Sequence, residues 1–562
     1  MPLVSRTFDQ IINFTRTSAA TFTGSNGLVQ YTPQSVNLLT FTQEFDNAGW
    51  TKTNATIAAN SLLAPDDTNT ADTITAGAAN ATVLQSFTAS AVPYTFSVWL
   101  RRLTGTGNVE ITVDGTTYVA VAVTTTWTRF STTLTPAAGA RNAGIRVVTS
   151  ADAVYAWGAQ LQTGSTATTY TRNFGGLFPP RFDFNPVTLA PRGLLMEEQR
   201  ANQLTYSEDI TNGVWLMLGT AGASRAANAA VSPDGATTAD RYSVGTGTGA
   251  WYIANYANQS IVSGQAYTFS VYIKANGLNF VFIRPHNNNG NFGASGFIVS
   301  LTDGTITYPS APTAPGSTGT AINVGNGWWR ITATSTANLT TATSGGPGIW
   351  PCNGTTFSGA GGGSPATFTG DGTSGVFIWG AQLETGAFAT SYIPTVASQV
   401  TRTGDFSLIS DPNFTPWYSQ PEGTLFVEAE SVVPIMPGAS GLFISSALSN
   451  GPSLTNLVQT YTAAGEWSVI GATPAGTQFA MSIPSSYTPN TPAKFGFAYR
   501  VNDFAAAVNN STPVADTSGA VPTVSQFNIG SLPAGNQING RIRRIVFYPT
   551  RLTNAQLQAL TA

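Results

Sequence analysis

Short stretches in which apolar and polar residues alternate recur along most of this chain. In YTFSVWL (residues 94–100), Tyr94, Phe96 and Val98 alternate with Thr, Ser and Trp, and VFIWGAQLE (residues 376–384) has a similar pattern. A period of two residues is that of a β-strand, whose side chains point alternately to opposite faces. Asp-Gly, Asn-Gly and Gly-Asn pairs, which favour tight turns, recur between these stretches. The pattern predicts an all-β fold of antiparallel β-sandwiches.

The chain also contains an internal duplication. NLLTFTQEFDNAGW (residues 37–50) corresponds to NQLTYSEDITNGVW (residues 202–215), and the two copies close with WGAQLQTGSTATTYTRN from Trp157 and WGAQLETGAFATSYIPT from Trp379. Further matching pairs follow in the same order: PDDTNTAD with PDGATTAD, YTFSVWLRR with YTFSVYIKA, Trp127 with Trp328 and Arg129 with Arg330. Landmarks repeated in one order indicate two copies of one domain, and each copy is too long for a solenoid repeat.

The duplication divides the chain into five expected parts. We expect an N-terminal attachment or oligomerisation segment, two related β-sandwiches joined by a Pro-rich connector, and a C-terminal jelly roll. In chain order their bounds are residues 1–36, 37–175, 176–201, 202–398 and 399–562. The second sandwich is the longer copy, and its Gly-rich insertions, RPHNNNGNFGASG and SGAGGGSPATFTGDGTSG, predict long loops.

Composition supports an all-β chain and excludes several classes of partner. Of the 562 residues, 42% are hydrophobic and only 9% are charged, against roughly a quarter in ordinary globular proteins. The net charge of −3 comes without a basic run, so nucleic-acid binding is not expected. No apolar run approaches the ~20 residues of a membrane span, so membrane insertion is not expected either. The N-terminus lacks the apolar region of a signal peptide, and the lone Cys352 excludes internal disulfides.

The two related units resemble the carbohydrate-binding-module-like jelly rolls of bacteriophage virion proteins. NLLTFTQEFDNAGWTKT, NQLTYSEDITNGVW and WGAQLETGAFATSYIPT carry this resemblance. FTRTSAATFTGSNGLVQ (residues 14–30) and PRFDFNPVTLAPRGLLMEEQRANQLTYSE (residues 180–208) resemble the same proteins, where these two segments usually follow each other closely. Here the first sandwich stands between them. Proteins of this kind are head-spike, head-fibre or tail-fibre components.

The C-terminal part, from Thr401 to Ala562, resembles a concanavalin A or laminin G-like jelly roll. EGTLFVEAE, KFGFAYRVNDFAAAVNNS and INGRIRRIVFYPTRLTNAQLQAL carry this resemblance. The last stretch predicts a strand followed by a short helix, which Thr553 or Asn554 can cap.

Glycan recognition needs aromatic faces for stacking and polar groups for hydroxyls, and the duplication helps to choose candidates. Aromatic residues found at the same landmark in both copies are interpreted as scaffold: Trp50, Trp127, Trp215, Trp328 and the core residues Trp157 and Trp379. Residues found in one copy are the candidates for glycan binding: Trp251, Tyr252, Trp329, Trp350 and, in a loop, His286 with Asn287, Asn288 and Asn289. Exposed aromatic rings could instead contact a neighbouring subunit.

Two pairs of acids were weighed for catalysis. Glu428 and Glu430 share one face of a predicted strand about 6.6 Å apart, a spacing found in glycosidases. A solvated outer face, with Val427 and Ala429 inward, explains the pair equally simply. Glu197 and Glu198 lie between modules, where a surface or linker ion pair is expected. No catalytic role is therefore predicted.

The remaining candidates favour structural roles. One histidine permits no His-based metal cluster, and Cys352 is expected to be an inert thiol. Asp72 and Asp240 occupy matching positions, either in structural calcium sites or as caps of strand ends. No cofactor is expected.

The sequence thus predicts a non-enzymatic bacteriophage virion component, a fibre, spike or decoration protein made in the host cytoplasm. Its partners would be other virion proteins and host-surface polysaccharide, and fibres of this kind are usually homotrimers. Three alternatives remain at this point: a polysaccharide depolymerase, a purely structural cement protein of capsid or tail, and a cell-surface adhesin.

Overall fold

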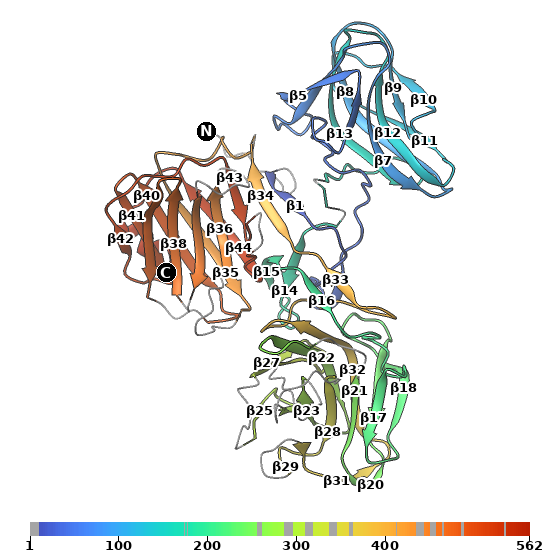
Figure 1. Ribbon diagram of the computed structural model, residues 1–562, viewed down its shortest axis with the longest axis vertical. Helices are drawn as coiled ribbons and strands as arrows, with labels where there is room; N and C mark the ends of the chain where they lie inside the picture. The colour runs from blue at the N-terminus through green and yellow to red at the C-terminus, as the bar shows by residue number, and fades with distance from the viewer. Residues whose placement is uncertain are drawn as a thin grey trace.

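Three β-sandwiches make up the protein (Figure 1). The computed structural model describes residues 11–173, 175–176, 178–255, 261–285, 296–309, 318–336, 346–358, 364–411, 413–433, 443–449, 457–463, 466–484, 488–532 and 536–562. The strand pairs between sheet neighbours are antiparallel throughout, which confirms the predicted fold class. Figure 1 places the third sandwich beside the joint between the other two.

The first sandwich has two five-stranded sheets around one core. One sheet has the order β10-β9-β12-β7-β4, with strands Tyr118–Val121, Val109–Thr112, Gly139–Val147, Ala81–Ala89 and Thr51–Thr53. The other has the order β11-β8-β13-β6-β5, with strands Thr128–Leu134, Tyr94–Thr104, Ala153–Thr163, Ala71–Ala76 and Ala55–Leu62. Phe96 and Val98 of β8 are fully buried in the core, as the alternation predicts.

The second sandwich repeats this strand order with one extra edge strand on each sheet. The first sheet has the order β17-β21-β28-β23-β24-β25, with strands Trp215–Gly219, Trp251–Asn255, Gly348–Cys352, Phe280–Arg284, Phe297–Ser300 and Ile306–Thr307. The second has the order β18-β19-β32-β22-β27-β26, with strands Ser224–Ala230, Ala239–Ser243, Gly375–Thr385, Ala266–Asn276, Trp328–Thr336 and Thr318–Asn323. Two short two-stranded sheets extend it: β20 (Thr246–Gly249) with β31 (Phe368–Asp371), and β29 (Phe357–Ser358) with β30 (Ser364–Pro365). The strand orders of corresponding sheets in the two sandwiches agree when one order is reversed, apart from the extra edge strands β25 and β26.

Repeated residues make repeated contacts in the two sandwiches. Buried Asn37 donates to Ala159 O and Thr171 O, and buried Asn202 donates in the same way to Ala381 O and Ile393 O. The phrase WGAQL forms a β-bulge in both copies, because the register shifts after Trp157 in β13 and at the same place in β32. The glycine of each bulge adopts a positive φ, 65° at Gly158 and 62° at Gly380, which favours glycine.

The third sandwich packs two seven-stranded sheets together. One has the order β1-β34-β43-β36-β37-β38-β39, with strands Asn13–Thr15, Phe406–Ser410, Gln526–Ile529, Phe443–Ser449, Leu457–Ala463, Glu466–Thr473 and Gly476–Ile483. The other has the order β14-β15-β44-β35-β40-β41-β42, with strands Arg181–Phe184, Pro191–Met196, Gly540–Tyr548, Glu422–Ser431, Ala493–Arg500, Asp503–Val508 and Val514–Asp516. Helix α2 (Asn554–Leu560) follows β44 and begins with a capping box at Thr553, as expected.

Two expected boundaries need correction. The segment 1–36 was expected to stand apart for attachment, yet β1 is an edge strand of the third sandwich, paired with β34. The connector 176–201 supplies β14 and β15, which pair with β44 of the same sandwich. These strands join the third sandwich because Phe14, Leu194 and Met196 are buried in its core. The first sandwich is therefore inserted between β1 and β14 of the third.

A small hairpin links this core to the second sandwich. Strands β2 (Thr21–Thr23) and β3 (Val29–Tyr31) pair with each other and cover the outer face of the sheet that contains β22, β27 and β32. Thr21 Oγ1 donates to Tyr392 O at 2.6 Å, and Val29 N donates to Pro233 O at 3.0 Å. Another antiparallel pair, β16 (Arg200–Asn202) with β33 (Val400–Arg402), joins the entry of the second sandwich to its exit.

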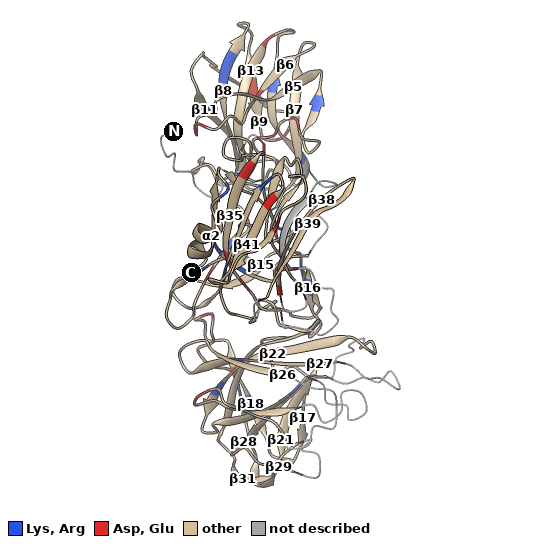
Figure 2. Cartoon of the chain, turned by 90° about the vertical axis from the view of Figure 1, so that its left-hand side faces the viewer, with Lys and Arg blue, Asp and Glu red and all other residues tan. Residues whose placement is uncertain are grey.

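Charged residues are sparse on the strands, as Figure 2 shows. Helix α2, with 7 residues, falls far short of the ~20 residues that span a bilayer, and the described part of the chain contains no helix that does.

Candidate functional site

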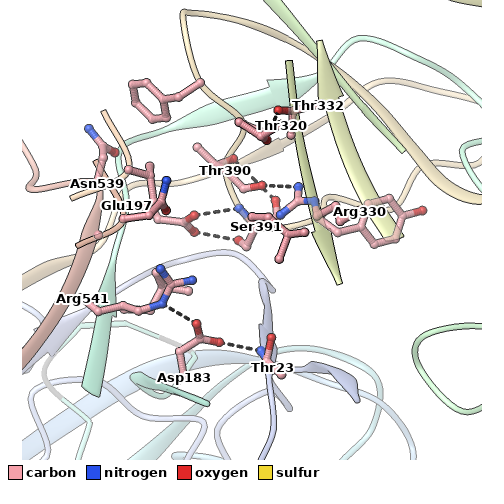
Figure 3. Close-up of a pocket in the computed structure, with 18 of the residues that line it drawn as sticks. Thr23, Asp183, Glu197, Thr320, Arg330, Thr332, Thr390, Ser391, Asn539 and Arg541 are labelled. Atoms are coloured by element: carbon pink, nitrogen blue, oxygen red, sulfur yellow. Dashed lines mark hydrogen bonds and ion pairs between the residues drawn. The ribbon is translucent and has the colours of Figure 1, made fainter. Parts of the chain in front are cut away.

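A cleft of about 320 Å³ opens where the hairpin, the second sandwich and the third sandwich meet (Figure 3). The hairpin supplies Phe22 and Val29, and the third sandwich supplies Asn490, Asn539 and Arg541. Such a volume lies at the lower end of small-molecule sites. The remaining lining residues come from β14, β15, β26, β27 and the exit of the second sandwich: Asp183, Arg192, Glu197, Thr318, Thr320, Ile322, Arg330, Thr332, Thr334, Phe388, Thr390 and Ser391, among others.

Strands β26 and β27 form a hydroxyl-rich wall of this cleft. Alternate residues of a strand share a face, which is why Thr332 lines the cleft while Ile331 lies in the core. Thr320 and Thr332 are hydrogen-bonded to each other at 2.5 Å across the two strands. Arg330 lies 5.4 Å from the ring centroid of Tyr272 and donates to Thr390 O. This wall offers hydroxyl groups and one cation beside an aromatic ring.

The opposite wall holds arginines neutralised by acids behind them. Arg541 Nε donates to Asp183 Oδ2 at 2.5 Å, and its Nη1 donates to Glu430 Oε1 at 3.0 Å. Arg192 Nη2 bonds to the same oxygen of Glu430. Asp183 also accepts from the backbone N–H of Thr23, which fixes the hairpin against this wall.

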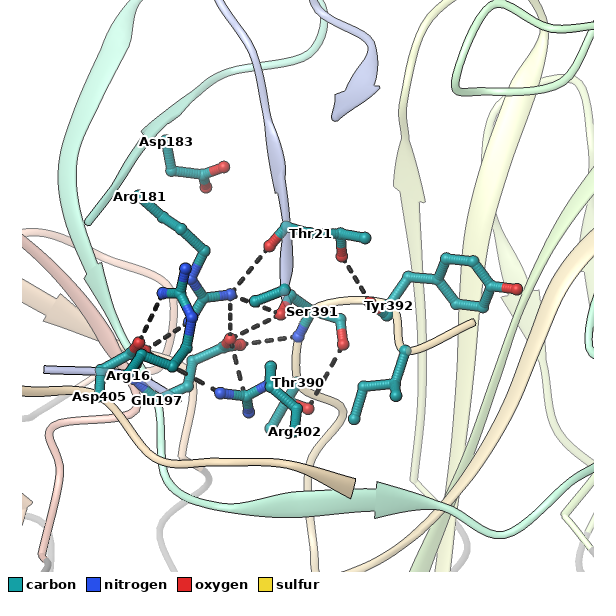
Figure 4. A network of polar contacts seen from close by, with 12 residues as sticks. Arg16, Thr21, Arg181, Asp183, Glu197, Thr390, Ser391, Tyr392, Arg402 and Asp405 are labelled. Atoms are coloured by element: carbon teal, nitrogen blue, oxygen red, sulfur yellow. Dashed lines mark hydrogen bonds and ion pairs between the residues drawn. The ribbon is translucent and has the colours of Figure 1, made fainter. Parts of the chain in front are cut away.

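A buried ion network adjoins the cleft, and its member Glu197 lines the cleft (Figure 4). Asp405 binds Arg16 Nη1 at 2.9 Å and Arg181 Nη2 at 2.5 Å, and all three side chains are 0% exposed. Glu197 binds Arg181 Nη1 at 2.7 Å and lies 3.6 Å from Arg402 Nη2. Arg181 lies in β14, and Arg16 and Glu197 directly follow β1 and β15. Arg402 is the last residue of β33, and Asp405 lies between β33 and β34. The network therefore joins segments that are far apart in sequence.

Glu197 is held ionised in this network. Burial alone would raise its pKa, but the charges of Arg402 and Arg181 and two hydrogen bonds from Ser391 outweigh burial and hold the pKa well below its usual range. A general acid needs a pKa near the working pH, so Glu197 is unsuited to donate a proton. Sequence analysis placed this residue at the surface or in a linker; the structure corrects that, because it is 5% exposed.

The single-copy aromatic residues separate into two groups. Trp251 is 0% exposed and Trp329 8% exposed, and both lie in the core of the second sandwich. Their indole N–H groups donate to Ala221 O and Leu301 O. Trp329 faces away from its neighbour Trp328, which lies in a cluster on the outer face of the same sheet. This burial argues against stacking of Trp251 or Trp329 on a sugar ring.

Tyr252 and Trp350 do come together, on the outer face of the other sheet. Their rings stack with centroids 4.4 Å apart, and Phe282 meets Trp350 edge-on at 5.2 Å. Trp350 is 3% exposed and Tyr252 half-buried, so only Tyr252 presents part of its ring to solvent. Glycan binding by these residues stays a prediction. His286 and Asn287 to Asn289 lie outside the described residues.

The scaffold residues behave as expected. Trp50, Trp215 and Trp328 are each 1% exposed and Trp127 is half-buried. Trp157 and Trp379 are buried too, but in aromatic clusters on the outer face of their sheets rather than between the sheets. Cys352 lies in the cluster of Trp350, where burial raises the pKa of its thiol to about 12.

The two matched aspartates cap backbone groups. Asp72 accepts from the N–H groups of Phe45 and Asn60, and Asp240 accepts equivalently from Ile210 and Asn228. Burial raises the pKa of Asp72 to about 7 despite these hydrogen bonds. Within the described ranges, no group of three or more His, Cys, Asp or Glu side chains is placed to hold a metal ion. The capping interpretation therefore accounts for both residues.

Glu428 and Glu430 do not form a solvated pair. Val427 and Ala429 point into the core as expected, but Glu430 is 1% exposed and binds Arg192, Arg541 and Arg543. Glu428 is half-buried and lies 3.8 Å from Arg543. The expectation of a solvated face is wrong for Glu430, because Arg541 and Arg543 of the neighbouring β44, with Arg192 of β15 on the far side of β44, cover its carboxylate.

Sequence reasoning missed the cleft itself. Its walls come from the hairpin, the second sandwich and the third sandwich. The alternation of apolar and polar residues along a strand gives no information about how such parts pack against one another. One usable signal was the run of Thr at alternate positions in residues 318–334, which marks a hydroxyl-rich strand face.

No family model and no curated protein matches the sequence. Among solved structures, the tandem CBM22-1–CBM22-2 domain of Paenibacillus barcinonensis Xyn10C is 14% identical, with the match covering 63% of this chain and 99% of that one (TM-score 0.22). Domain 4 of the arabinanase AbnA from Geobacillus stearothermophilus, in complex with arabinotriose, is 11% identical, covering 31% and 82% (TM-score 0.23). Mouse laminin alpha1 domains LG4-5 are 10% identical, covering 53% and 85% (TM-score 0.20). At TM-scores this low, no functional argument rests on these likenesses.

Proposed function

We propose that this protein is a structural component of a bacteriophage virion, a fibre, spike or decoration protein, that binds host-surface polysaccharide through its β-sandwich modules. It acts without catalysis, contacts other virion proteins, and assembles as a homotrimer. The observation that carries glycan binding is the cleft, whose lining combines hydroxyls, amides and arginines with the rings of Phe22, Tyr272 and Phe388.

This lining matches the chemistry of sugars. Threonine hydroxyls and the amide of Asn490 can exchange hydrogen bonds with ring hydroxyls, while aromatic rings cover the apolar faces of sugars. The cleft is small and open, so each site would bind weakly. Several copies on one particle would make such binding effective, because linked sites bind with a high effective concentration.

Binding by the cleft can be tested with two matched variants. Thr332→Trp fills the cleft from the β27 wall, whereas Ser131→Trp places the same bulk at the equivalent position of β11 in the first sandwich. We expect Thr332→Trp to reduce binding of the full-length protein to host polysaccharide at least tenfold on a glycan array, with Ser131→Trp unchanged. Equal binding by both variants and the unmodified chain would contradict a role for the cleft. Immunogold electron microscopy of intact particles tests the virion location.

A further inference from the structure

We infer that the cleft recognises the carboxylate of an acidic sugar, through Arg192 and Arg541. This inference rests on the proposed function and adds the class of ligand to it. It specifies the charge of the bound sugar, because a wall of hydroxyl groups alone does not distinguish acidic from neutral sugars.

The charges that the opposite wall exposes are those of arginines. The side chains of Arg192 and Arg541 are 21% and 14% exposed, whereas those of Asp183 and Glu430 are 2% and 1% exposed. The acids therefore lie behind the guanidinium groups. A ligand that enters the cleft meets the more exposed guanidinium groups at this wall. Glu430 does not line the cleft, and the lining carboxylates of Asp183 and Glu197 are almost fully buried and paired with arginines.

Both guanidinium groups keep donors available. Arg541 uses Nε on Asp183 and Nη1 on Glu430, and Arg192 uses Nη2 on Glu430. The described residues give no hydrogen-bond acceptor to Nη2 of Arg541 or to Nη1 and Nε of Arg192. A planar guanidinium fork matches a carboxylate in geometry and charge.

The two arginines also lie close together. Both bind the same oxygen of Glu430, so one carboxylate serves two cations. Burial lowers the pKa of Arg192, and the neighbouring charge of Arg541 lowers it further. An anion bound between them would relieve this repulsion. Hydroxyl groups of Thr320 and Thr332 on the facing wall would then hold the sugar ring.

Acidic bacterial polysaccharides and their carboxyl-reduced forms, printed side by side on an array, test the inference. Reduction converts each uronate to the neutral sugar and leaves linkage and ring unchanged. The full-length protein should bind an acidic form at least tenfold more tightly than its reduced form. Arg192→Gln should abolish this preference.

Arg543→Gln is the matched control. Arg543 also binds Glu430, at 3.6 Å, but does not line the cleft. This variant should keep the preference, and unfolding curves of both variants check that each is folded. Equal binding of acidic and reduced forms would overturn the inference and leave glycan binding intact. Loss of the preference in Arg543→Gln as well would overturn the assignment to the cleft, and binding to no glycan would overturn both proposals.

Discussion

At the scale of single residues, Asn37 and Asn202 explain why the duplicated landmarks persist without any catalytic group. Each side chain is buried and satisfies backbone groups of the bulge and of the tail that leaves the sandwich. Asn202 Oδ1 also accepts from Leu204 N and Leu383 N. An amide with two donors and one acceptor oxygen is the group that can satisfy all four.

Replacing Asn202 should therefore destabilise the second sandwich. Asn202→Ala leaves buried carbonyl and N–H groups without partners, so we expect the free energy of unfolding to fall by about 3 kcal/mol. Urea denaturation followed by tryptophan fluorescence measures this. Asn69→Ala, at an exposed asparagine, is the control and should change stability by less than about 0.5 kcal/mol. Equal effects would contradict the role assigned to Asn202.

Residue-level prediction placed the matched aromatic residues correctly, whereas burial argues against glycan binding by two single-copy residues, Trp251 and Trp329. Thr51 and Leu216 follow the matched tryptophans of the two copies, and they pair with Leu84 and Ala254. Three residues earlier on these partner strands lie Ala81 in β7 and Trp251 in β21, which are therefore at equivalent positions. Both side chains are buried in their cores. The second sandwich has wider sheets, and a larger core takes a larger residue. A tryptophan found in one copy therefore need not bind a ligand, and no sequence signal distinguished these two cases.

At the scale of elements, the strands were predictable but their sheets were not. Alternation in residues 94–100 and 376–384 identified β8 and β32 correctly. Pairing of β1 with β34 joins residues almost 400 positions apart, at Asn13 and Leu408. Local periodicity holds no information about such partners. The separated segments 14–30 and 180–208 were the one hint, since β1, β14 and β15 all belong to the third sandwich.

The assignment of β1 to this sandwich leads to a test. Phe14 is 7% exposed and lies in the core of the third sandwich, so Phe14→Ala should lower its stability by about 3 kcal/mol. Val36→Ala, at a side chain 53% exposed, is the control and should have little effect. Differential scanning calorimetry of the full chain reports the shift. An unchanged transition in Phe14→Ala would mean that residues 11–16 are not part of this core.

At the scale of the whole molecule, the buried ion network around Asp405 and Glu197 joins segments of the third sandwich to the exit of the second sandwich. A buried pair that loses one partner costs about 3–5 kcal/mol, since the other charge stays buried alone. The buried charges of Arg16, Arg181 and Arg402 therefore depend on their pairing with the carboxylates of Asp405 and Glu197. Neither this network nor the cleft beside it was predictable from sequence, because each arises from packing between modules.

The network should make the joint sensitive to acid. The pKa of Glu197 is lower in the folded protein than in the unfolded chain, so its contribution to stability is complete above the unfolded value of about 4.5 and falls as the pH decreases below it. Small-angle X-ray scattering and limited proteolysis at pH 7 and pH 3 should show the joint loosening at acid pH. Glu197→Gln should loosen it already at pH 7, whereas Glu466→Gln, at an exposed glutamate, should behave as the unmodified chain. A joint that stays closed in Glu197→Gln at pH 7 would contradict this assignment.

The insertion of the first sandwich has a consequence for how such proteins diversify. Its chain enters at Asn37 and leaves at Asn173, and these residues are bonded to each other, through Asn173 Nδ2 and Asn37 O. When the two ends of an inserted domain are adjacent, the insertion adds little loop-closure entropy to the folding of the surrounding sandwich, whatever the length of the inserted domain. Recombination could therefore exchange this entire module as a cassette, altering the surface that the protein presents while the strands that anchor the module stay the same.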